Sequence, residues 1–347
     1  MTIRQILALI LFPVASYSQS PGLPEVNLLY TSSPKQSFRG LSVPSDEIVW
    51  VSGQGMVLRS VNGGQRFDSL PVKGYEKTEF RDIEAFDANK AVILGIGRPG
   101  VILQTRDGGK NWQKIYEDTA EGVFLDAMTF NNKGRGLAVG DPIHGHGYFV
   151  GIDANRGFAM KINLDIRFNE GEAFFAASGT NVQFTKPTKN KLDKVVFVTG
   201  GKSSRFYDEE WINLPMMQGK ESTGANSIDI WNKRNMVVVG GDYKNDTETG
   251  GNCAYSTNKG LTWHQSSHPP HGYRSCVTYL SENELVACGT SGIDYSNDGG
   301  KSWQLISKES YHVVQKSNTG DAVFLAGTKG KIARLRLPQP SPPARKS

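Results

Sequence analysis

Several features that would point to a particular chemistry are scarce or missing in this sequence of 347 residues. It has three cysteines, Cys253, Cys276 and Cys288, whose odd number and spacing fit no zinc knuckle. We interpret them as buried small residues, with a disulfide as the alternative. No run of basic residues occurs, and a formal net charge of +5 is too small to predict nucleic-acid binding. No glycine fingerprint follows a strand and opens a helix, which argues against a dinucleotide-dependent oxidoreductase, and we expect no cofactor.

Long apolar segments are missing as well. The apolar stretch at residues 6–14 is too short to span a bilayer. It follows Arg4 and precedes Ser16 and Ser18, which are small residues at the −3 and −1 positions of a cleavage site. This pattern predicts a secretory signal peptide at residues 1–18 and export to the periplasm or the extracellular space. We therefore expect no membrane span.

An eight-residue pattern recurs along the remaining chain. It reads Ser or Thr, any residue, Asp or Asn, any residue, Gly, any two residues, then Trp or Phe, and occurs at 60–67, 105–112, 256–263 and 296–303. A weaker copy covers 151–158, and Trp211 is the candidate marker of a sixth. The Asp or Asn oxygen can accept backbone N–H groups of its own turn, and the glycine can adopt a left-handed conformation. We predict a structural role for Asn62, Asp107, Asp153, Asn258, Asp298, Trp112, Trp263 and Trp303.

The closing aromatics of these copies are 40 to 53 residues apart. A period near 40–50 residues made of strand-like pieces is typical of a β-propeller. The second unit, for example, divides into strands at 80–86, 91–97, 101–107 and 112–117. Unit starts recur at 38–40, 80–82, 124–126, 171–173, 226–228, 273–275 and 311–313, which predicts seven blades.

The last unit has three strands before a Pro-rich tail. We predict that the missing strand comes from residues 26–32, because this pairing would close the ring and remove its open edges. The prediction is an all-β, seven-bladed β-propeller over residues 19–337. Residues 338–347 are predicted to be a disordered tail.

The repeated octapeptide is similar to the Asp-box, or bacterial neuraminidase repeat. The longer unit, with Phe-Arg-Asp at its start and Thr-x-Asp-Gly-Gly-x-x-Trp at its end, resembles the photosystem II stability/assembly factor family of seven-bladed propellers, whose repeats are also WD40/YVTN-like. The segments LAVGDPIHGHG and GEAFFAASGTN are similar to a secreted bacterial branch. The resemblance covers nearly all of the mature chain and implies the propeller fold. Asp-box propellers include sialidases, other glycosidases, sorting receptors and assembly chaperones, so it implies no single function.

The predicted strand order places the boxes on one face of the ring. The residues that begin the first strand of each blade, and the loops between second and third strands, are predicted to lie on the opposite face, which we call the top face. Arg39, Arg81 and Arg274 share one blade position there. The resemblance implies that such arginines form a patch for partner binding, and guanidinium groups suit carboxylates and phosphates. The alternative is that each arginine ties its blade to a neighbour. The candidate binding residues are Arg39, Arg81, Arg274, Asp82, Asp126, Glu172 and Tyr243.

Our preferred interpretation is a secreted, non-catalytic, monomeric propeller that binds a protein or glycan with acidic groups. The alternative is a sialidase-like glycoside hydrolase or a lyase, although Gly40 and Leu41 follow Arg39 where a sialidase has Ile and Pro. A structural module without a ligand is the third possibility. We predict no catalytic residue and no metal site. His144, His146 and the loop 242–248 are the segments whose spacing a metal ion could use.

Overall fold

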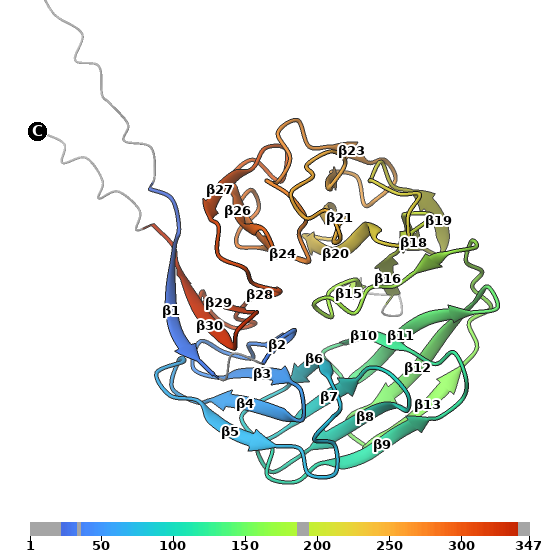
Figure 1. Cartoon of the computed structure of the whole chain (residues 1–347), viewed down its shortest axis with the longest axis vertical. Helices are drawn as coiled ribbons and strands as arrows, with labels where there is room; N and C mark the ends of the chain where they lie inside the picture. Colours follow the sequence, from blue (N-terminus) through green and yellow to red (C-terminus); the bar gives the residue numbers. More distant parts are fainter. Residues whose placement is uncertain (1–21, 33–35, 186–193, 339–347) are drawn as a thin grey trace, which may run out of the picture.

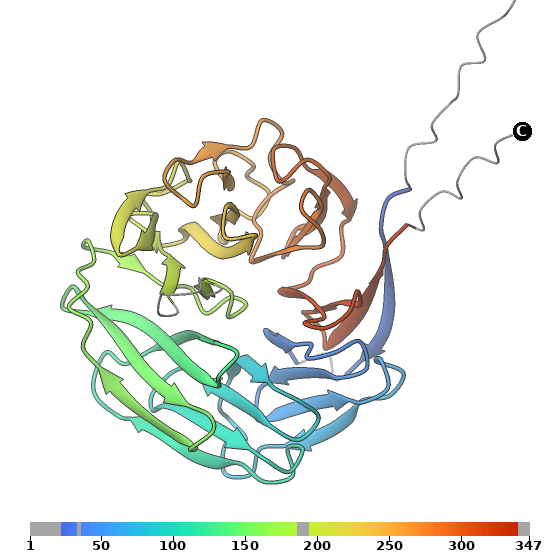
Figure 2. The same cartoon turned by 180° about the vertical axis from the view of Figure 1, so that it is seen from behind.

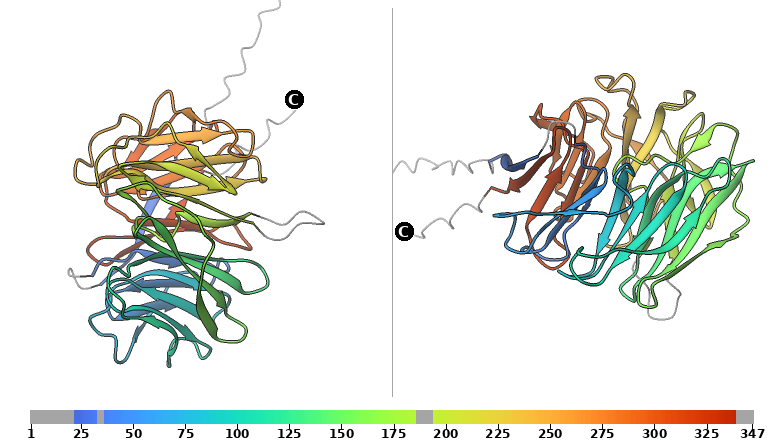
Figure 3. Two further views of the ribbon diagram at one scale, coloured as in Figure 1. Left: turned by 90° about the vertical axis from the view of Figure 1, so that its right-hand side faces the viewer. Right: turned by 60° about the horizontal axis from the view of Figure 1, so that its bottom comes forward.

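The computed structural model describes residues 22–32, 36–185 and 194–338, and every element in these ranges is a β-strand. The predicted signal peptide and residues 339–347 of the predicted tail lie outside the described residues. The strands form seven antiparallel sheets, six with four strands and one with six, arranged in a ring whose central axis we call the channel (Figure 1). Views from behind and from the side show loops on both faces of this ring, with the strands running between them (Figures 2 and 3).

The strands of a blade follow one another from the channel to the rim. The first blade contains β2 (Gly40–Ser42), β3 (Val49–Gly53), β4 (Met56–Ser60) and β5 (Asp68–Pro71); the second β6 (Phe80–Ala85), β7 (Ala91–Gly95), β8 (Gly100–Thr105) and β9 (Gln113–Asp118); the third β10 (Leu125–Phe130), β11 (Arg135–Ile143), β12 (His146–Asp153) and β13 (Phe158–Ile162). The fourth contains β15 (Val182–Thr185), β16 (Lys194–Val198), β18 (Arg205–Asp208) and β19 (Glu210–Asn213); the fifth β20 (Thr223–Trp231), β21 (Asn235–Asp242), β22 (Cys253–Ser256) and β23 (His264–Gln265). The sixth contains β24 (Cys276–Tyr279), β25 (Leu285–Gly289), β26 (Gly292–Ser296) and β27 (Gln304–Ser307); the seventh β28 (Val313–Lys316), β29 (Val323–Ala326), β30 (Lys331–Arg336) and, at its rim, β1 (Glu25–Thr31).

The two ends of the described chain meet in the seventh blade. Strand β1 pairs antiparallel with β30, from Glu25 opposite Arg336 to Thr31 opposite Lys331. Figure 1 shows this as the blue strand beside the red one. The pairing is the one that the three-stranded last unit predicted, and it covers the edge that β30 would otherwise expose.

The fourth blade does not begin at residues 171–173 as predicted. The last two of those residues form β14 (Glu172–Ala173), which pairs with β17 (Gly200–Gly201) and joins the sheet of the fifth blade. Residues 174–181, which we call the channel loop, then project into the centre of the ring next to β15 (Figure 1). Ser178 Oγ donates to the Ser275 carbonyl at 2.7 Å, and the Thr180 and Ser227 hydroxyls are 2.7 Å apart, so the loop is bonded to the fifth and sixth blades.

The Asp-boxes form hydrogen-bonded turns at the rim of four blades. In the second blade Asp107 Oδ1 accepts the Thr105 hydroxyl at 2.9 Å and the Asn111 N–H at 3.0 Å, and Gly109 N–H donates to Thr105 Oγ1. Gly109 has a φ of 85°, and a Cβ there would lie 2.8 Å from Leu70 Cδ1 in the preceding blade. A glycine is therefore needed both for the turn and for the contact between blades. Trp211 follows a tight turn instead of a box, with Asp208 opposite Glu210.

The three cysteines are free and buried, including Cys276 and Cys288, which lie opposite each other on β24 and β25. The described residues include no helix that is long and apolar enough to cross a membrane.

Candidate functional site

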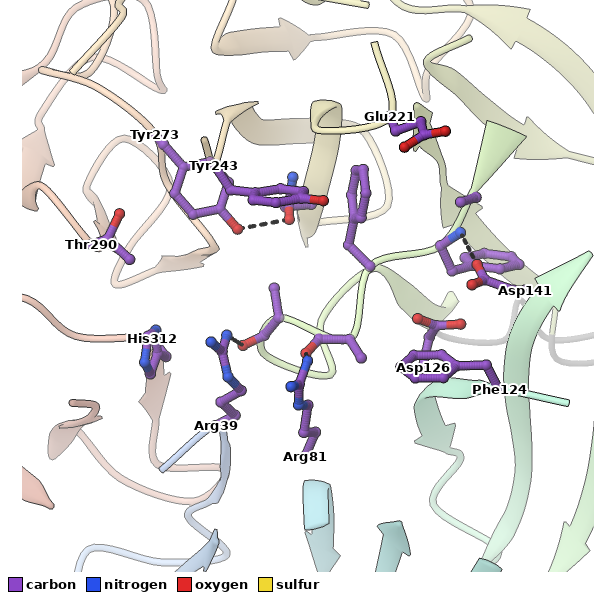
Figure 4. Close-up of a pocket in the computed structure, with 16 residues that line it drawn as sticks. Arg39, Arg81, Phe124, Asp126, Asp141, Glu221, Tyr243, Tyr273, Thr290 and His312 are labelled. Atoms are coloured by element: carbon purple, nitrogen blue, oxygen red, sulfur yellow. Dashed lines mark hydrogen bonds between the residues drawn. The ribbon is translucent and has the colours of Figure 1, made fainter. Parts of the chain in front are cut away.

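A pocket of about 470 Å³ lies at the top-face end of the channel (Figure 4). The channel loop forms one side of it through residues 173–177. The rest of the lining comes from residues at the start of the first strand of a blade and from loops between second and third strands. The predicted strand order places both groups of residues on this face. Of the predicted binding residues, Arg39, Arg81, Asp126 and Tyr243 line it. It is also lined by residues absent from that prediction: Phe124, Asp141, Glu221, Asn226, Tyr273, Thr290 and His312.

Bulges in the inner strands aim three of the lining residues into the pocket. The strand register shifts between Phe80 and Asp82, between Leu125 and Ala127, and between Ala225 and Ser227. The residues in the middle of these shifts, Arg81, Asp126 and Asn226, all line the pocket. A bulge inserts an extra residue into one strand and redirects its side chain, so the same irregularity brings an arginine, an aspartate and an asparagine together.

Two guanidinium groups enter the pocket side by side. Arg39 Nη1 donates to the Ala177 carbonyl at 3.4 Å, and Arg81 Nη1 donates to the Ala176 carbonyl at 3.3 Å. Arg81 also pairs with Glu79 at 2.7 Å, whereas Arg39 has no salt bridge to any described residue. Burial and the adjacent Arg81 lower the pKa of Arg39. A guanidinium group has five N–H donors, so Arg39 keeps most of its donors available for an anion.

His312 lies next to Arg39 (Figure 4). Its Nε2 is 3.1 Å from the Ser37 hydroxyl, and its Nδ1 is buried without a partner among the described residues. Burial, together with the charges of Arg39 and Arg81, lowers the pKa of His312 to about 3. The ring is therefore neutral at ordinary pH and adds no positive charge to this side of the pocket.

Two carboxyl groups lie together on the other side of the pocket, on the paired strands β10 and β11. Asp126 is 1% exposed, and its Oδ2 has no hydrogen-bond partner in the described part of the chain. Burial and the nearby Asp141 raise the pKa of Asp126 well above its usual range, although Arg81 acts in the opposite direction. Asp141 is partly exposed, and its Oδ1 accepts the Phe174 N–H at 3.2 Å. Burial raises the pKa of Asp141 to about 6.

Aromatic rings complete the wall. Tyr243 is 43% exposed and packs edge-on against Phe175 and Tyr273, with ring centroids 5.9 and 6.4 Å away. Tyr273 donates its hydroxyl to Asn226 Oδ1 at 2.8 Å. The pocket thus offers apolar surface beside its charged groups, a combination found in sites for small ligands and chain segments.

Arg274 does not join Arg39 and Arg81, which corrects the predicted cluster of three arginines. It is 0% exposed, its Nε donates to Asp294 Oδ2 at 2.7 Å, and its Nη1 donates to Ser291 Oγ at 2.8 Å. The cause is Asp294, two residues before the box in the sixth blade. The equivalent positions before the boxes of the first two blades hold Leu58 and Leu103. Blade six therefore supplies a buried carboxylate that turns its arginine inward.

Asp82 and Glu172 also lie away from the pocket. Asp82 follows the bulged residue of β6, so its carboxylate points into the sheet and accepts the Ile83 and Met128 N–H groups at 2.7 and 2.6 Å. It lines a separate pocket at the opposite end of the channel. Glu172 forms a buried ion pair with Arg205, whose guanidinium stacks 3.8 Å from the centre of the Trp211 ring. These contacts indicate structural roles.

The side chains whose spacing a metal ion could use contact neighbouring protein groups instead. His146 Nε2 contacts Arg167, and His144 occupies the hairpin turn with a φ of 52°. In the loop 242–248, Asp242 accepts the Lys244 N–H and Asp246 accepts the Thr290 hydroxyl. Among the described residues no group of three or more His, Cys, Asp or Glu side chains could hold a metal ion.

Comparisons with known proteins agree with this architecture. The model of a family described as BNR/Asp-box repeat matches residues 294–305, which contain the last box, and no curated protein matches the chain. The solved structure "YCF48 bound to D1 peptide" is 16% identical, with a TM-score of 0.60 over 93% of this chain and 99% of that one. YCF48 from Cyanidioschyzon merolae is 15% identical, with a TM-score of 0.61 over 91% and 99%. The Pan2 WD40 domain of Neurospora crassa is 14% identical, with a TM-score of 0.60 over 91% and 96%.

These likenesses confirm, at the level of fold, the resemblance to the photosystem II assembly-factor propellers and to WD40-like propellers. At such low sequence identities, the similarity to these structures does not assign a function to any site residue. The chain is a seven-bladed β-propeller that contains the Asp-box repeat.

Proposed function

We propose that this propeller is a non-catalytic binding scaffold whose top-face pocket takes a protein segment through a carboxylate of that segment. The observation that carries the proposal is Arg39, a partly buried guanidinium without a salt-bridge partner among the described residues, placed beside Arg81. A buried charge is costly unless it is paired, and a carboxylate can accept two parallel N–H groups from one guanidinium. That a YCF48 structure has a D1 peptide bound supports the idea that this kind of propeller can accommodate a peptide.

The pocket suits a short segment better than a broad protein surface. Its volume of about 470 Å³ is within the range of small-ligand sites and would hold a few side chains. Tyr243 and Phe175 offer apolar contact beside the arginines. A glycan with an acidic group is the second ligand class with the same recognition chemistry, and the test below separates it from a peptide.

The sialidase-like alternative would assign catalysis to Asp126 and Asp141. A catalytic acid, base or nucleophile must reach the reacting atoms. Asp126 is 1% exposed and its Oδ2 is covered, so it is poorly placed to contact a sugar. We therefore favour binding over hydrolysis.

A peptide array tests the proposal. Acidic peptides are displayed beside matched peptides in which each Glu is replaced by Gln, and sialylated and sulfated glycans are displayed on the same surface. We expect the protein to bind a subset of Glu peptides and to lose them in the Gln versions. The variant Arg39→Gln/Arg81→Gln should lose this preference, whereas Arg66→Gln, an 81% exposed arginine away from the pocket, should keep it. Unchanged binding by the double variant would refute the proposal, and exclusive binding to glycans would replace the peptide as ligand.

We also propose that the protein is exported after cleavage behind Ser18 and acts as a monomer. The charged start, short apolar stretch and small residues near the cleavage site support export. N-terminal sequencing of the protein recovered from an envelope or culture fraction tests it, and an intact Met1 on a cytosolic protein would contradict it. Sedimentation tests the oligomeric state.

A further inference from the structure

The charges of the top-face pocket are divided between its two sides. In Figure 4 Arg39 and His312 lie on one side, Asp126 and Asp141 lie on the other, and Arg81 lies between them. The two carboxyl groups come from adjacent strands of the third blade, whereas Arg39 and Arg81 come from the first and second. The proposed carboxylate ligand uses the arginine side and leaves the aspartate side without a role.

The aspartate side has no cation of its own and shares the charge of Arg81. Asp126 is almost fully buried, yet its Oδ2 accepts no hydrogen bond from any described residue. Arg81, whose charge lowers the pKa of Asp126, is already paired with Glu79. Two carboxylates in one desolvated site are costly to ionise together, and the shared charge of Arg81 offsets only part of this cost.

A bound organic cation would remove this cost. Asp141 is the accessible member of the pair, and no described residue donates to its Oδ2. An ammonium or guanidinium group in the pocket could donate to Asp141, while the covered Asp126 contributes its charge from behind. A metal ion is a poorer fit, because Ca²⁺ takes six to eight oxygen ligands and the described part of the chain has no third carboxylate or histidine in this cluster.

We infer that the pocket recognises a bipolar ligand, with a carboxylate at Arg39 and Arg81 and an amine or guanidine at Asp126 and Asp141. The inference rests on the proposed function and adds a second, cationic requirement to it. The chemical class is a chain segment or small molecule that carries both charges a few bonds apart, such as an acidic residue close to a lysine or a free amino terminus. A ligand of this kind satisfies both sides of the pocket at once.

A series of ω-amino acids tests the inference without knowledge of the natural ligand. Glycine, β-alanine, 4-aminobutyrate and 6-aminohexanoate are compared by ligand-observed NMR with carboxylates and with alkylamines of the same length. We expect one amino acid of the series to bind about tenfold more tightly than its matched carboxylate, since a charge-assisted contact in a desolvated site contributes at least that factor. Asp141→Asn should abolish the gain from the amine and leave carboxylate binding in place. Glu170→Gln, which changes a 94% exposed carboxylate, is the matched control.

The outcomes separate the two proposals. Carboxylate binding without any gain from an amine at any length would overturn the bipolar ligand and leave the proposed function standing. Amine binding that Asp141→Asn removes, without any carboxylate binding, would support the cationic site and contradict the proposed function. An equal gain from the amine in wild type and Asp141→Asn would place the amine elsewhere and overturn the inference. Thermal unfolding of each variant verifies that it is folded.

Discussion

Arg39 and Arg274 occupy the same blade position but have different surroundings, so the same substitution should lower the stability much more at Arg274 than at Arg39. Arg274 is fully buried and bonded to Asp294, which is also buried. Arg274→Met would remove the buried cation of Asp294 and leave its carboxylate with only the ring and the backbone N–H of His271 as partners among the described residues. Arg39→Met would remove one hydrogen bond of 3.4 Å and would relieve the repulsion between Arg39 and Arg81.

The expected magnitudes follow from these environments. Removal of one partner from a buried ion pair costs about 3–5 kcal/mol. A folded domain of roughly 300 residues, with about 2.1 cal/mol/K of unfolding entropy per residue, loses about 0.6 kcal/mol for each degree of melting temperature. Arg274→Met should therefore lower Tm by about 5–8 °C. Arg39→Met should lower the free energy of unfolding by less than about 1 kcal/mol and Tm by less than about 2 °C.

Differential scanning calorimetry of both variants, with urea unfolding as a second measurement, gives the comparison. The variant Arg274→Met/Asp294→Asn is the control, because it leaves no unpaired charge and should recover part of the lost stability. An acidic peptide that binds the wild type should still bind Arg274→Met below its melting temperature and should bind Arg39→Met weakly. The reasoning is refuted if Arg274→Met melts within a degree of the wild type, or if Arg39→Met is the less stable of the two.

Three further predictions concern the box, the ring closure and the carboxyl pair. Hydrogen bonding by the Asn111 N–H lowers the pKa of Asp107 to about 2, so the stability that this carboxylate contributes is fully present above pH 4 and is lost as the pH falls through about 2. Asp107→Ala should cost about 1 kcal/mol at pH 7 and clearly less at pH 2 in urea unfolding, with ligand binding intact. Removal of residues 22–31 should expose the edge of β30 and cause aggregation in light scattering, and a stable monomer would contradict the need for β1. Affinity for alkylamine probes should fall as the pH drops below about 6, where Asp141 gains a proton, and a constant affinity from pH 5 to 8 would contradict this. The other charged and titratable groups that line the pocket with Asp141 are Asp126, Arg81, Arg39, Glu221, His312, Tyr243 and Tyr273. His312 stays neutral over this range because its pKa is lowered to about 3.

The blades could be predicted from the sequence because their determinants are local. A box such as 105–112 contains its own hydrogen-bond partners and its own left-handed glycines, so its turn forms wherever the pattern occurs. The N-terminal strand was predictable by counting, since the last unit lacked one strand. The channel loop was not predictable in this way. Residues 171–173 resemble a unit start, and the eight residues that enter the channel have no counterpart in another blade.

The site was predictable only in part, because the direction of a side chain depends on distant residues. Arg81 and Arg274 each follow an aromatic residue at a unit start, but a carboxylate twenty residues after Arg274 draws it into its blade. Asp82 and Asp126 align as third residues of their units, yet the bulge lies at residue 81 in one blade and at residue 126 in the other. A one-residue change in register turns a side chain to the opposite face of a strand. A comparison of the residues that stand two positions before each box would have identified Asp294 as the one carboxylate at that position.

The asymmetry of the pocket follows from these exceptions to the repeat. Seven identical blades would surround the channel with one residue repeated seven times, and a ring of arginines or aspartates would repel itself. Here the first and second blades contribute arginines, the third contributes two aspartates, and the seventh contributes a neutral histidine. The channel loop adds the carbonyl groups of Ala176 and Ala177, which hold the arginines in place. A ligand with two charges can therefore bind in one orientation, with its carboxylate over the first two blades and its amine over the third. Exchange of the two charges in a probe peptide of otherwise identical sequence should abolish binding, because the reversed ligand would place like charges together on both sides of the pocket.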